Sequence, residues 1–461
     1  MERRTVESFL LCGNDRKRIR GEYQKVYREA DKVVLRLGRG GEGMLLVKKE
    51  VLALTGEQET ILGHMRYAAF KLWNVANYEK RNYKELGMEK FPDWYDQKKR
   101  LKENFFYKNL PSQTAQDVLA QLHQAWKSFF RLKETGGVRE PKPPRFKQEP
   151  MDITFLKDAV RQEGEYIRLT IPKQLKKYLK ENGTDAEYLY LKTKRFSDIR
   201  IRQLEIKKEK DVYTALAVYE AKSAGQQEEN GRYLSIDLGI TNTFACYDSS
   251  GKTFLIRGLL NLTHYYDKKI AYYQGISDSQ QAAKKVKHPK KSKRVLELYR
   301  KKKNSVDDFI HKATRYLSDY CVKEDIHTVV IGDLKGIRKE KDLGRLNQQL
   351  HAFPFAKIVQ KLRYKLELSG IRMIEQKESY SSQCSPLSEG VGKAYAEKKN
   401  RKHRGLYVDG RKVYNADCVG AYNILRLYLQ EKGEGFPEAK GLSSPKKVSV
   451  QAVKKPAVVG A

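Results

Sequence analysis

The stretch RYLSIDLGITNTFACYDSSGKTFLIRG, residues 232–258, decides the fold class of this chain. It contains three apolar, strand-forming runs, at 233–238, 242–247 and 253–257, and the turn sequence Ser-Ser-Gly-Lys separates the last two. Runs of this length with short connections predict three consecutive antiparallel strands.

Helix and strand patterns alternate after this stretch. The predicted elements are helices before a strand at 327–331, a helix at 355–368 that stops at Gly370, a strand at 371–376 and a helix from Asn415. This order predicts an α/β domain over residues 223–435. Residues 436–461 are predicted to form a disordered tail.

The earlier part of the chain divides into helical and β segments. Residues 1–55 form an N-terminal extension with a first strand, and Thr55 with Gln58 is a capping box that starts a helical lobe over 56–148. Alternating apolar residues then predict a small barrel or sandwich over 149–222, which the strand near residue 50 joins across the helical insertion.

The charge of the chain indicates its class of partner. It has 92 Lys and Arg against 57 Asp and Glu, a net charge of +35, which favours a polyanionic partner. The 40% hydrophobic content suffices for buried cores. Neither a signal peptide nor a membrane-spanning apolar run is recognisable, so we expect a protein of the cytoplasm or nucleoid without membrane partners.

Two acidic residues stand where chemistry is often found. Asp237 ends the first strand of the α/β domain, and Asp417 lies in the first turn of the last helix, behind the expected N-cap Asn415. Two converging carboxylates repel one another unless a cation lies between them, as in the divalent-metal sites that hydrolyse phosphodiesters. The alternatives are that Asp417 only supports the helix start and that Asp237 only forms a turn.

A third carboxylate is expected on a neighbouring strand. That strand ends in Gly332, which cannot bind metal, and Asp333 points to the other face by the alternation of a strand. The next strand leads to Glu378, whose side chain is long enough to reach the same cluster, whereas Glu375 has the opposite parity. The alternative for Glu378 is that it is only a solvated charge at a strand end.

Four ordered motifs carry a family resemblance. They are IDLGI from Ile236, VVIGDLKGIR from Val329, ESYSSQCS from Glu378 and NADCVGAYNIL from Asn415. Together they resemble the split RuvC nuclease domain, which has an RNase H-like fold, of the TnpB proteins of insertion sequences and of the related compact type V CRISPR effectors. The resemblance implies a multidomain α+β protein in which a β-barrel wedge domain with an inserted helical recognition lobe precedes the nuclease domain.

The resemblance also implies catalytic roles. Asp237, Glu378 and Asp417 correspond to catalytic carboxylates that bind Mg²⁺ or Mn²⁺, with Glu378 replacing the glutamate that most relatives have at the position of Gly332. The family's zinc ribbon is missing its other cysteines after Cys384, so residues 384–414 are expected to form a target-binding insertion without zinc. The sequence YVDGRKVY within it predicts a hairpin.

For the partners, the resemblance implies a guide RNA and double- and single-stranded target DNA, bound by a monomer or a dimer on RNA. Two basic runs, 284–303 and 398–412, are predicted to flank the carboxylates and counter their repulsion of phosphate. The alternatives are that each charge run is only a solvated face and that PRFK at 144–147 is only a linker. The candidate nucleic-acid-binding residues are Arg145, Lys147, Lys290, Lys291, Lys293, Arg294, Arg300, Lys301, Arg401, Lys402 and Arg404.

The leading hypothesis is therefore an RNA-guided, metal-dependent DNA endonuclease that reads a short flanking motif. A nuclease-dead guided repressor is the alternative that Gly332 raises. A sugar kinase or chaperone-type ATPase also has a motif like IDLGITNT, but neither the second phosphate loop nor the adenosine motif of that superfamily is recognisable, and the charge of +35 would be unexplained.

Overall fold

The computed structural model describes residues 35–36, 43–136, 138–333, 352–401 and 405–450. The chain forms two compact units, Met1–Lys222 and Ser223–Ala461, and each is described by itself. None of the helices that the structure describes is long and apolar enough to cross a membrane.

The first unit is built on an antiparallel sheet with the strand order β1-β2-β8-β7-β3. Its strands are β1 (Leu35–Arg36), β2 (Gly43–Val51), β8 (Val212–Lys222), β7 (Ile201–Glu209) and β3 (Ile153–Leu156). β2 pairs with β8 along its whole length, from Gly43 opposite Lys222 to Val51 opposite Thr214. The strand predicted near residue 50 thus joins the later β segment across the helical insertion.

A second, three-stranded sheet and the helices complete this unit. The sheet comprises β4 (Val160–Glu163), β5 (Tyr166–Thr170) and β6 (Tyr188–Lys192). The helices are α2 (Gly56–Arg81), α3 (Trp94–Arg100), α4 (Phe105–Lys108), α5 (Ser112–Thr135) and α6 (Lys173–Glu181), with short 3₁₀ turns at Leu101–Glu103 and Lys157–Ala159. Thr55 and Gln58 form the predicted capping box of α2.

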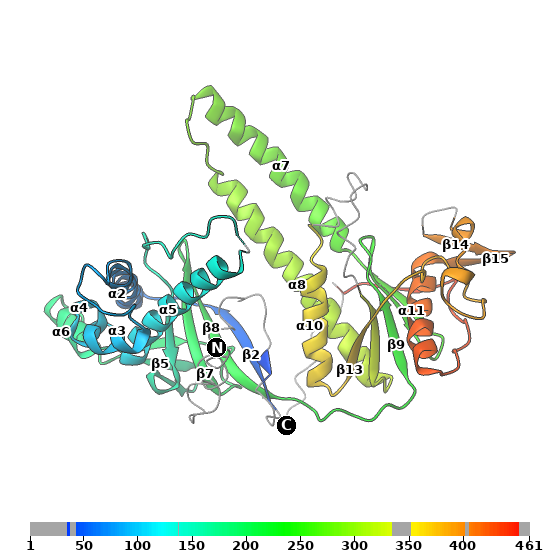
Figure 1. Ribbon diagram of the computed structural model, residues 1–461, viewed down its shortest axis with the longest axis horizontal. Helices are drawn as coiled ribbons and strands as arrows, with labels where there is room; N and C mark the ends of the chain where they lie inside the picture. Colours follow the sequence, from blue (N-terminus) through cyan, green and yellow to red (C-terminus); the bar gives the residue numbers. More distant parts are fainter. Residues whose placement is uncertain (1–34, 37–42, 137, 334–351, 402–404, 451–461) are drawn as a thin grey trace, which may run out of the picture. The chain divides into compact units, whose positions relative to one another are not determined.

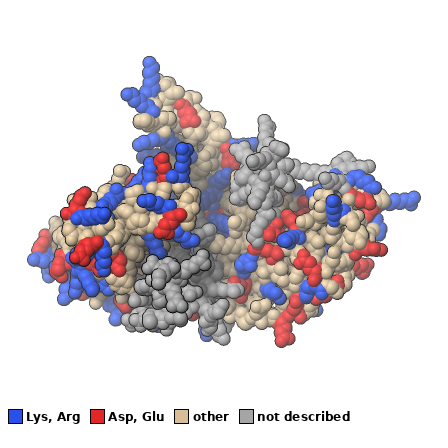
Figure 2. Space-filling view, viewed as in Figure 1, with Lys and Arg blue, Asp and Glu red and all other residues tan. Residues whose placement is uncertain are grey.

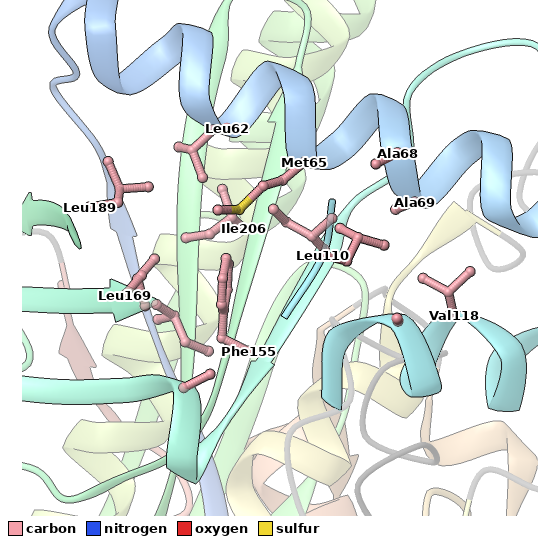
Figure 3. Packing of buried hydrophobic residues seen from close by; sticks show 14 of the residues in the cluster. Leu62, Met65, Ala68, Ala69, Leu110, Val118, Phe155, Leu169, Leu189 and Ile206 are labelled. Atoms are coloured by element: carbon pink, nitrogen blue, oxygen red, sulfur yellow. The ribbon is translucent and has the colours of Figure 1, made fainter. Parts of the chain in front are cut away.

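One hydrophobic core joins the helices and both sheets of the first unit. Leu62 and Met65 of α2 pack toward Phe155 of β3, Ile206 of β7 and Leu169 of β5 (Figure 3). All five side chains are at most 2% exposed. Because the helical insertion and the strands bury each other's apolar faces, we expect them to fold as one cooperative body.

The second unit has a six-stranded mixed sheet with the order β13-β12-β9-β10-β11-β16. Its strands are β9 (Tyr233–Asp237), β10 (Asn242–Asp248), β11 (Thr253–Arg257), β12 (Thr328–Gly332), β13 (Arg372–Gln376) and β16 (Lys446–Val448). β9, β10 and β11 are antiparallel as predicted, whereas β12 runs parallel to both β9 and β13. The carboxyl ends of β9, β12 and β13 therefore meet at one edge of the sheet.

Helices cover both faces of this sheet (Figure 1). α8 (Lys293–Lys323) and α10 (Phe355–Leu368) pack on one face against residues such as Ile236 and Ile331, and α11 (Ala416–Lys432) packs on the other against Ala245 and Val330. α7 (Leu259–Ala283) pairs with α8 in a hairpin that projects from the sheet. The predicted hairpin within residues 384–414 is β14 (Leu406–Asp409) paired with β15 (Lys412–Asn415), preceded by 3₁₀ turns at Lys393–Tyr395 and Lys398–Asn400.

The prediction of a disordered tail is wrong for residues 436–450. β16 adds to the sheet as a parallel neighbour of β11, and Leu442 and Val450 are each 1% exposed. The tyrosines Tyr247 and Tyr422 donate hydrogen bonds to backbone carbonyls of Glu438 and Pro437, at 2.8 and 2.7 Å. The polar composition of residues 436–450 gave no sign of this packing. Few apolar side chains anchor the segment, and its other contacts are mainly hydrogen bonds of the backbone.

Deleting residues 436–461 should destabilise the second unit. Losing the burial of Leu442 and Val450 alone costs about 3 to 6 kcal/mol, so the melting temperature should fall by several degrees. Deleting only 451–461 is the control, because this truncation leaves β16, Leu442 and Val450 in place. Equal melting of the two truncations, followed by circular dichroism, would contradict the packed tail.

Candidate active site

Asp237 lies where α11 comes closest to the sheet. In the β9–β10 ladder Asp237 is opposite Ala245, whose side chain faces α11. A Cβ atom added to Gly420 of α11 would lie 2.6 Å from Oδ2 of Asp237. Gly420 therefore leaves the space that the Asp237 carboxylate fills.

Asp417 is held by its neighbours at the start of α11. The N-cap Asn415 accepts a hydrogen bond from the backbone N–H of Cys418 at 3.1 Å, which fixes the first turn. Asn242 at the start of β10 donates through Nδ2 to Oδ2 of Asp417 at 2.5 Å, and Arg401 lies 3.7 Å from Oδ1. The expected N-cap is confirmed, and Asp417 has partners on two sides.

Glu378 occupies the space that the missing side chain of Gly332 leaves open. Gly332 ends β12, opposite Gln376 of β13, and Glu378 follows two residues later. A Cβ atom added to Gly332 would lie only 2.2 Å from Oε2 of Glu378 and 3.2 Å from Cδ1 of Ile424. Any larger residue at position 332 would displace the Glu378 carboxylate, so the two positions are sterically coupled.

Two further acidic residues, Glu375 and Asp333, lie near Glu378 on these strands or directly after them. Glu375 forms an ion pair with Arg363 of α10, on the opposite face of the sheet from α11. Asp333 donates its backbone N–H to Gln376 at 2.7 Å, and its charge acts on Glu378. Glu378, not Glu375, is the glutamate on the side of α11.

Burial and mutual repulsion define the electrostatics of the three carboxylates. Desolvation, together with the charges of Glu378 and Asp417, raises the pKa of Asp237 to about 8, against a smaller lowering by Arg401. Desolvation and the charge of Asp333 raise the pKa of Glu378 to about 7. Asp237 and Glu378 thus resist ionisation, and a nearby cation would relieve that cost.

The donor set suits a hard divalent cation. Asp237, Glu378 and Asp417 offer only carboxylate oxygens, the ligands that Mg²⁺ and Mn²⁺ prefer. Within the described residues the side chains of Asp237 and Glu378 accept no hydrogen bond, whereas Asn242 and Arg401 occupy Asp417. As these side chains stand, no three acidic, His or Cys residues of the described part converge tightly enough to hold an ion.

The predicted basic residues fall in different places. Arg401 reaches Asp417, whereas Lys402 and Arg404 lie outside the described residues. Residues Lys290 and Lys291 lie in the loop between α7 and α8, and Lys293, Arg294, Arg300 and Lys301 lie in α8. Arg145 and Lys147 belong to the first unit, where α2 binds their backbone through Trp73 and Asn74.

The prediction that residues 284–303 flank the carboxylates is wrong for the first half of this run. α7 leaves the sheet edge after Gly258 and is 25 residues long, so at about 1.5 Å per residue it carries Lys284 roughly 37 Å along the helix axis. Lys and Arg gather at the end of this projection (Figure 2). The clustering of basic residues in the sequence does not reveal the distance at which a helical hairpin places them from the carboxylates.

Sequence reasoning missed Asn242, the partner of Asp417. Asn242 is 7% exposed, and its Oδ1 finds no hydrogen-bond partner in the described part of the chain. The signal was present, because Asn242 opens the strand that pairs with the strand ending at Asp237. It therefore returns to the same sheet edge.

Two polar side chains of α11 fasten the segment after Glu378. Asn423 donates to the carbonyls of Ser381 and Cys384, both at 2.8 Å. Arg426, only 1% exposed, donates to the carbonyls of Ser385, at 2.9 Å, and Ser388. These hydrogen bonds tie the segment to α11.

Replacing Gly332 by alanine should act on Glu378. The added methyl group forces the Glu378 carboxylate out of its place. We therefore expect the rise in melting temperature on adding Mn²⁺ to shrink in Gly332→Ala and, to the same extent, in Glu378→Gln. Gly275→Ala in α7 is the matched control, because a Cβ atom there meets nothing within 4 Å. A full Mn²⁺ effect in Gly332→Ala would contradict the coupling of positions 332 and 378.

Arg426→Met should destabilise the second unit, because it leaves buried carbonyls without donors. We expect a loss of about 3 kcal/mol in the free energy of unfolding, measured by urea denaturation. Arg315→Met is the control, since that side chain is 63% exposed and should change stability by less than about 0.5 kcal/mol. If zinc chelation lowers stability and Arg426→Met does not, the segment depends on a metal instead.

Two family models match the second unit and the end of β8. Residues 215–338 match the family OrfB_IS605, described as a probable transposase, and residues 355–424 match the Cas12f1-like TNB domain. The first match contains Asp237 and Gly332, and the second contains Glu378 and Asp417. A comparison with curated proteins gives no match.

One solved structure shares the fold of this chain at low sequence identity. A Cas12f1–sgRNA–target DNA complex aligns with a TM-score of 0.52 and 15% identity over 89% of this chain and 86% of that one. A CRISPR-Cas12f ternary complex gives 0.35 and 16% over 81% and 82%, and the mini-RNA-guided endonuclease CRISPR-Cas_phi3 gives 0.36 and 9% over 83% and 92%. Only the first score is high enough to indicate a common fold. Together with the two family matches, which follow one another along the chain, it makes this protein similar to the TnpB and compact type V effector group.

Proposed function

We propose that this chain is an RNA-guided DNA endonuclease whose second unit is an RNase H-like RuvC domain. Asp237, Glu378 and Asp417 are its catalytic carboxylates. The observation that carries the proposal is that the Glu378 carboxylate fills the space beside Gly332. Glu378 thereby adds a third carboxylate at the sheet edge where β12 itself has none. The Cas12f1 structure of the same fold holds a guide RNA and target DNA, and a net charge of +35 suits such partners.

The three carboxylates would hold Mg²⁺ or Mn²⁺. When bound, the ions supply a water nucleophile and stabilise the leaving oxygen of the phosphodiester. The residues of this chain do the rest. The carboxylates of Asp237 and Glu378 accept no competing hydrogen bond from the described residues. Asn242 fixes the orientation of Asp417, and Arg401 adds positive charge beside it.

The other parts of the chain take the supporting roles of the family. The strands of the first unit would be the wedge, its helices 56–148 the recognition lobe, and residues 384–414 a target-binding insertion without zinc. Base pairing with the guide would read the target sequence, and the protein would read duplex shape and a short flanking motif. The basic tip of the α7–α8 hairpin would contact nucleic acid away from the carboxylates.

Cleavage by purified protein tests the proposal. We would purify the protein with co-expressed RNA and add Mg²⁺ and plasmids that carry a matching target beside a library of flanking motifs. Glu378→Gln and Asp237→Asn should each slow cleavage about a hundredfold or more, which corresponds to about 3 kcal/mol. Glu375→Gln is the matched control, since its ion pair lies on the other face, and should cleave within about twofold of wild type.

The same experiment separates the alternatives. Undiminished cleavage by Glu378→Gln would remove Glu378 from the site and leave the role of Gly332 unexplained. A wild-type protein that binds matched DNA in a guide-dependent way but cuts none of the library would be a guided repressor. A protein that retains no RNA would contradict the guided function altogether.

A further inference from the structure

A basic pocket of about 670 Å³ borders Asp417 on the side away from Glu378. Its volume lies within the range of ordinary ligand sites. It opens along the edge of the sheet beside β10, β11 and β16. The lining residues that matter here are Asn242, Arg257, Arg401, Asp417, Ser444 and Lys447.

The C-terminal segment builds one wall of this pocket. Its path across the sheet is fixed by three hydrogen bonds. Thr253 Oγ1 donates to the carbonyl of Gly441 at 2.6 Å, the backbone N–H of Asn415 to that of Leu442 at 2.9 Å, and Ser443 Oγ to that of Val413 at 2.8 Å. Together with the parallel pairing of β16, these bonds hold Ser444 and Lys447 in the pocket wall.

The charges of the pocket favour an anion. Arg257, Arg401 and Lys447 face it against the single carboxylate of Asp417. Arg401 pairs with Asp417, but Arg257 and Lys447 form no ion pair with any residue in the described part of the chain. Two uncompensated cations in a concave site, with the exposed Ser444 beside them, are suited to a phosphate group.

The shape of the site favours a chain of phosphates over a single small anion. A second pocket, of about 620 Å³, shares Thr241, Arg257 and Lys447 with the first and continues toward Gly258 and Phe309. The two pockets thus adjoin along the sheet edge and start beside Asp417. An extended strand whose scissile bond lies at the carboxylates would leave its next phosphates here.

We propose that this groove, completed by residues 443–447, binds backbone phosphates of the DNA strand that is cut, next to the scissile bond. The identity of the strand rests on the proposed function. The C-terminal segment is then part of the substrate site as well as of the fold. Lys447 and Arg257 are its phosphate-binding residues, because both face the groove from paired strands.

Crosslinking in a cleavage-disabled complex tests the groove without requiring cleavage. Asp237→Asn protein with its guide RNA would be mixed with matched DNA that carries an azidophenacyl phosphorothioate photoprobe at single linkages. Crosslinked peptides, identified by mass spectrometry, should contain residues 441–447. Crosslinks that avoid this segment from every labelled linkage would overturn the proposal.

Two adjacent lysines of β16 provide a matched pair of variants for the same assay. Lys447 is opposite Leu255, on the α11 face of the sheet, whereas Lys446 is opposite Phe254, which packs on the other face. Lys447→Ala should lower the crosslinking yield about threefold or more, and reduce the slope of log affinity against log salt by about 0.7. Lys446→Ala should change neither, and both should melt as wild type.

The experiments distinguish a failure of the groove proposal from a failure of the proposed endonuclease function. Equal effects of the two lysine variants would overturn the groove, even if wild-type protein cleaves DNA. A specific effect of Lys447→Ala together with a wild-type protein that never cleaves would keep the groove and reject the endonuclease.

Discussion

The second unit depends on how closely α11 approaches the sheet. Two glycines permit that approach. Gly420 on the helix makes room for Asp237, and Gly332 on β12 makes room for Glu378. A methyl group at either position would collide with a carboxylate oxygen, so helix, sheet and acidic side chains are fitted to one another. The same contact brings Asp417, in the first turn of α11, to the edge where β9 ends.

This packing has an electrostatic cost that explains the character of the site. Burial and the charges of Glu378 and Asp417 raise the pKa of Asp237, and Arg401 offsets only part of the effect. Such a cluster does not serve stability, because apolar side chains at the same place would give a higher free energy of unfolding. The cluster therefore indicates function, and divalent cations are the natural counter-charge.

Much of this could be predicted from the sequence. Strand alternation separated Glu375 from Glu378, and the N-cap at Asn415 placed Asp417, because both depend on local periodicity. The tail and the basic run at 284–303 were predicted wrongly for a different reason. β16 pairs with β11 through backbone hydrogen bonds to a strand far away in the sequence, which amino-acid composition does not reveal. The distance of the basic run from the carboxylates depends on the length and direction of α7, which composition does not reveal either. Asn242 was missed because its role exists only when β10 and α11 meet.

A structure of the complex with guide RNA, target DNA and Mn²⁺ would test the central claim most directly. The anomalous signal of manganese would locate the ions. We predict that an oxygen of Glu378 ligates an ion together with Asp237 and Asp417, above Gly332. Ions held without Glu378, for example with Asp333 in its place, would contradict the account.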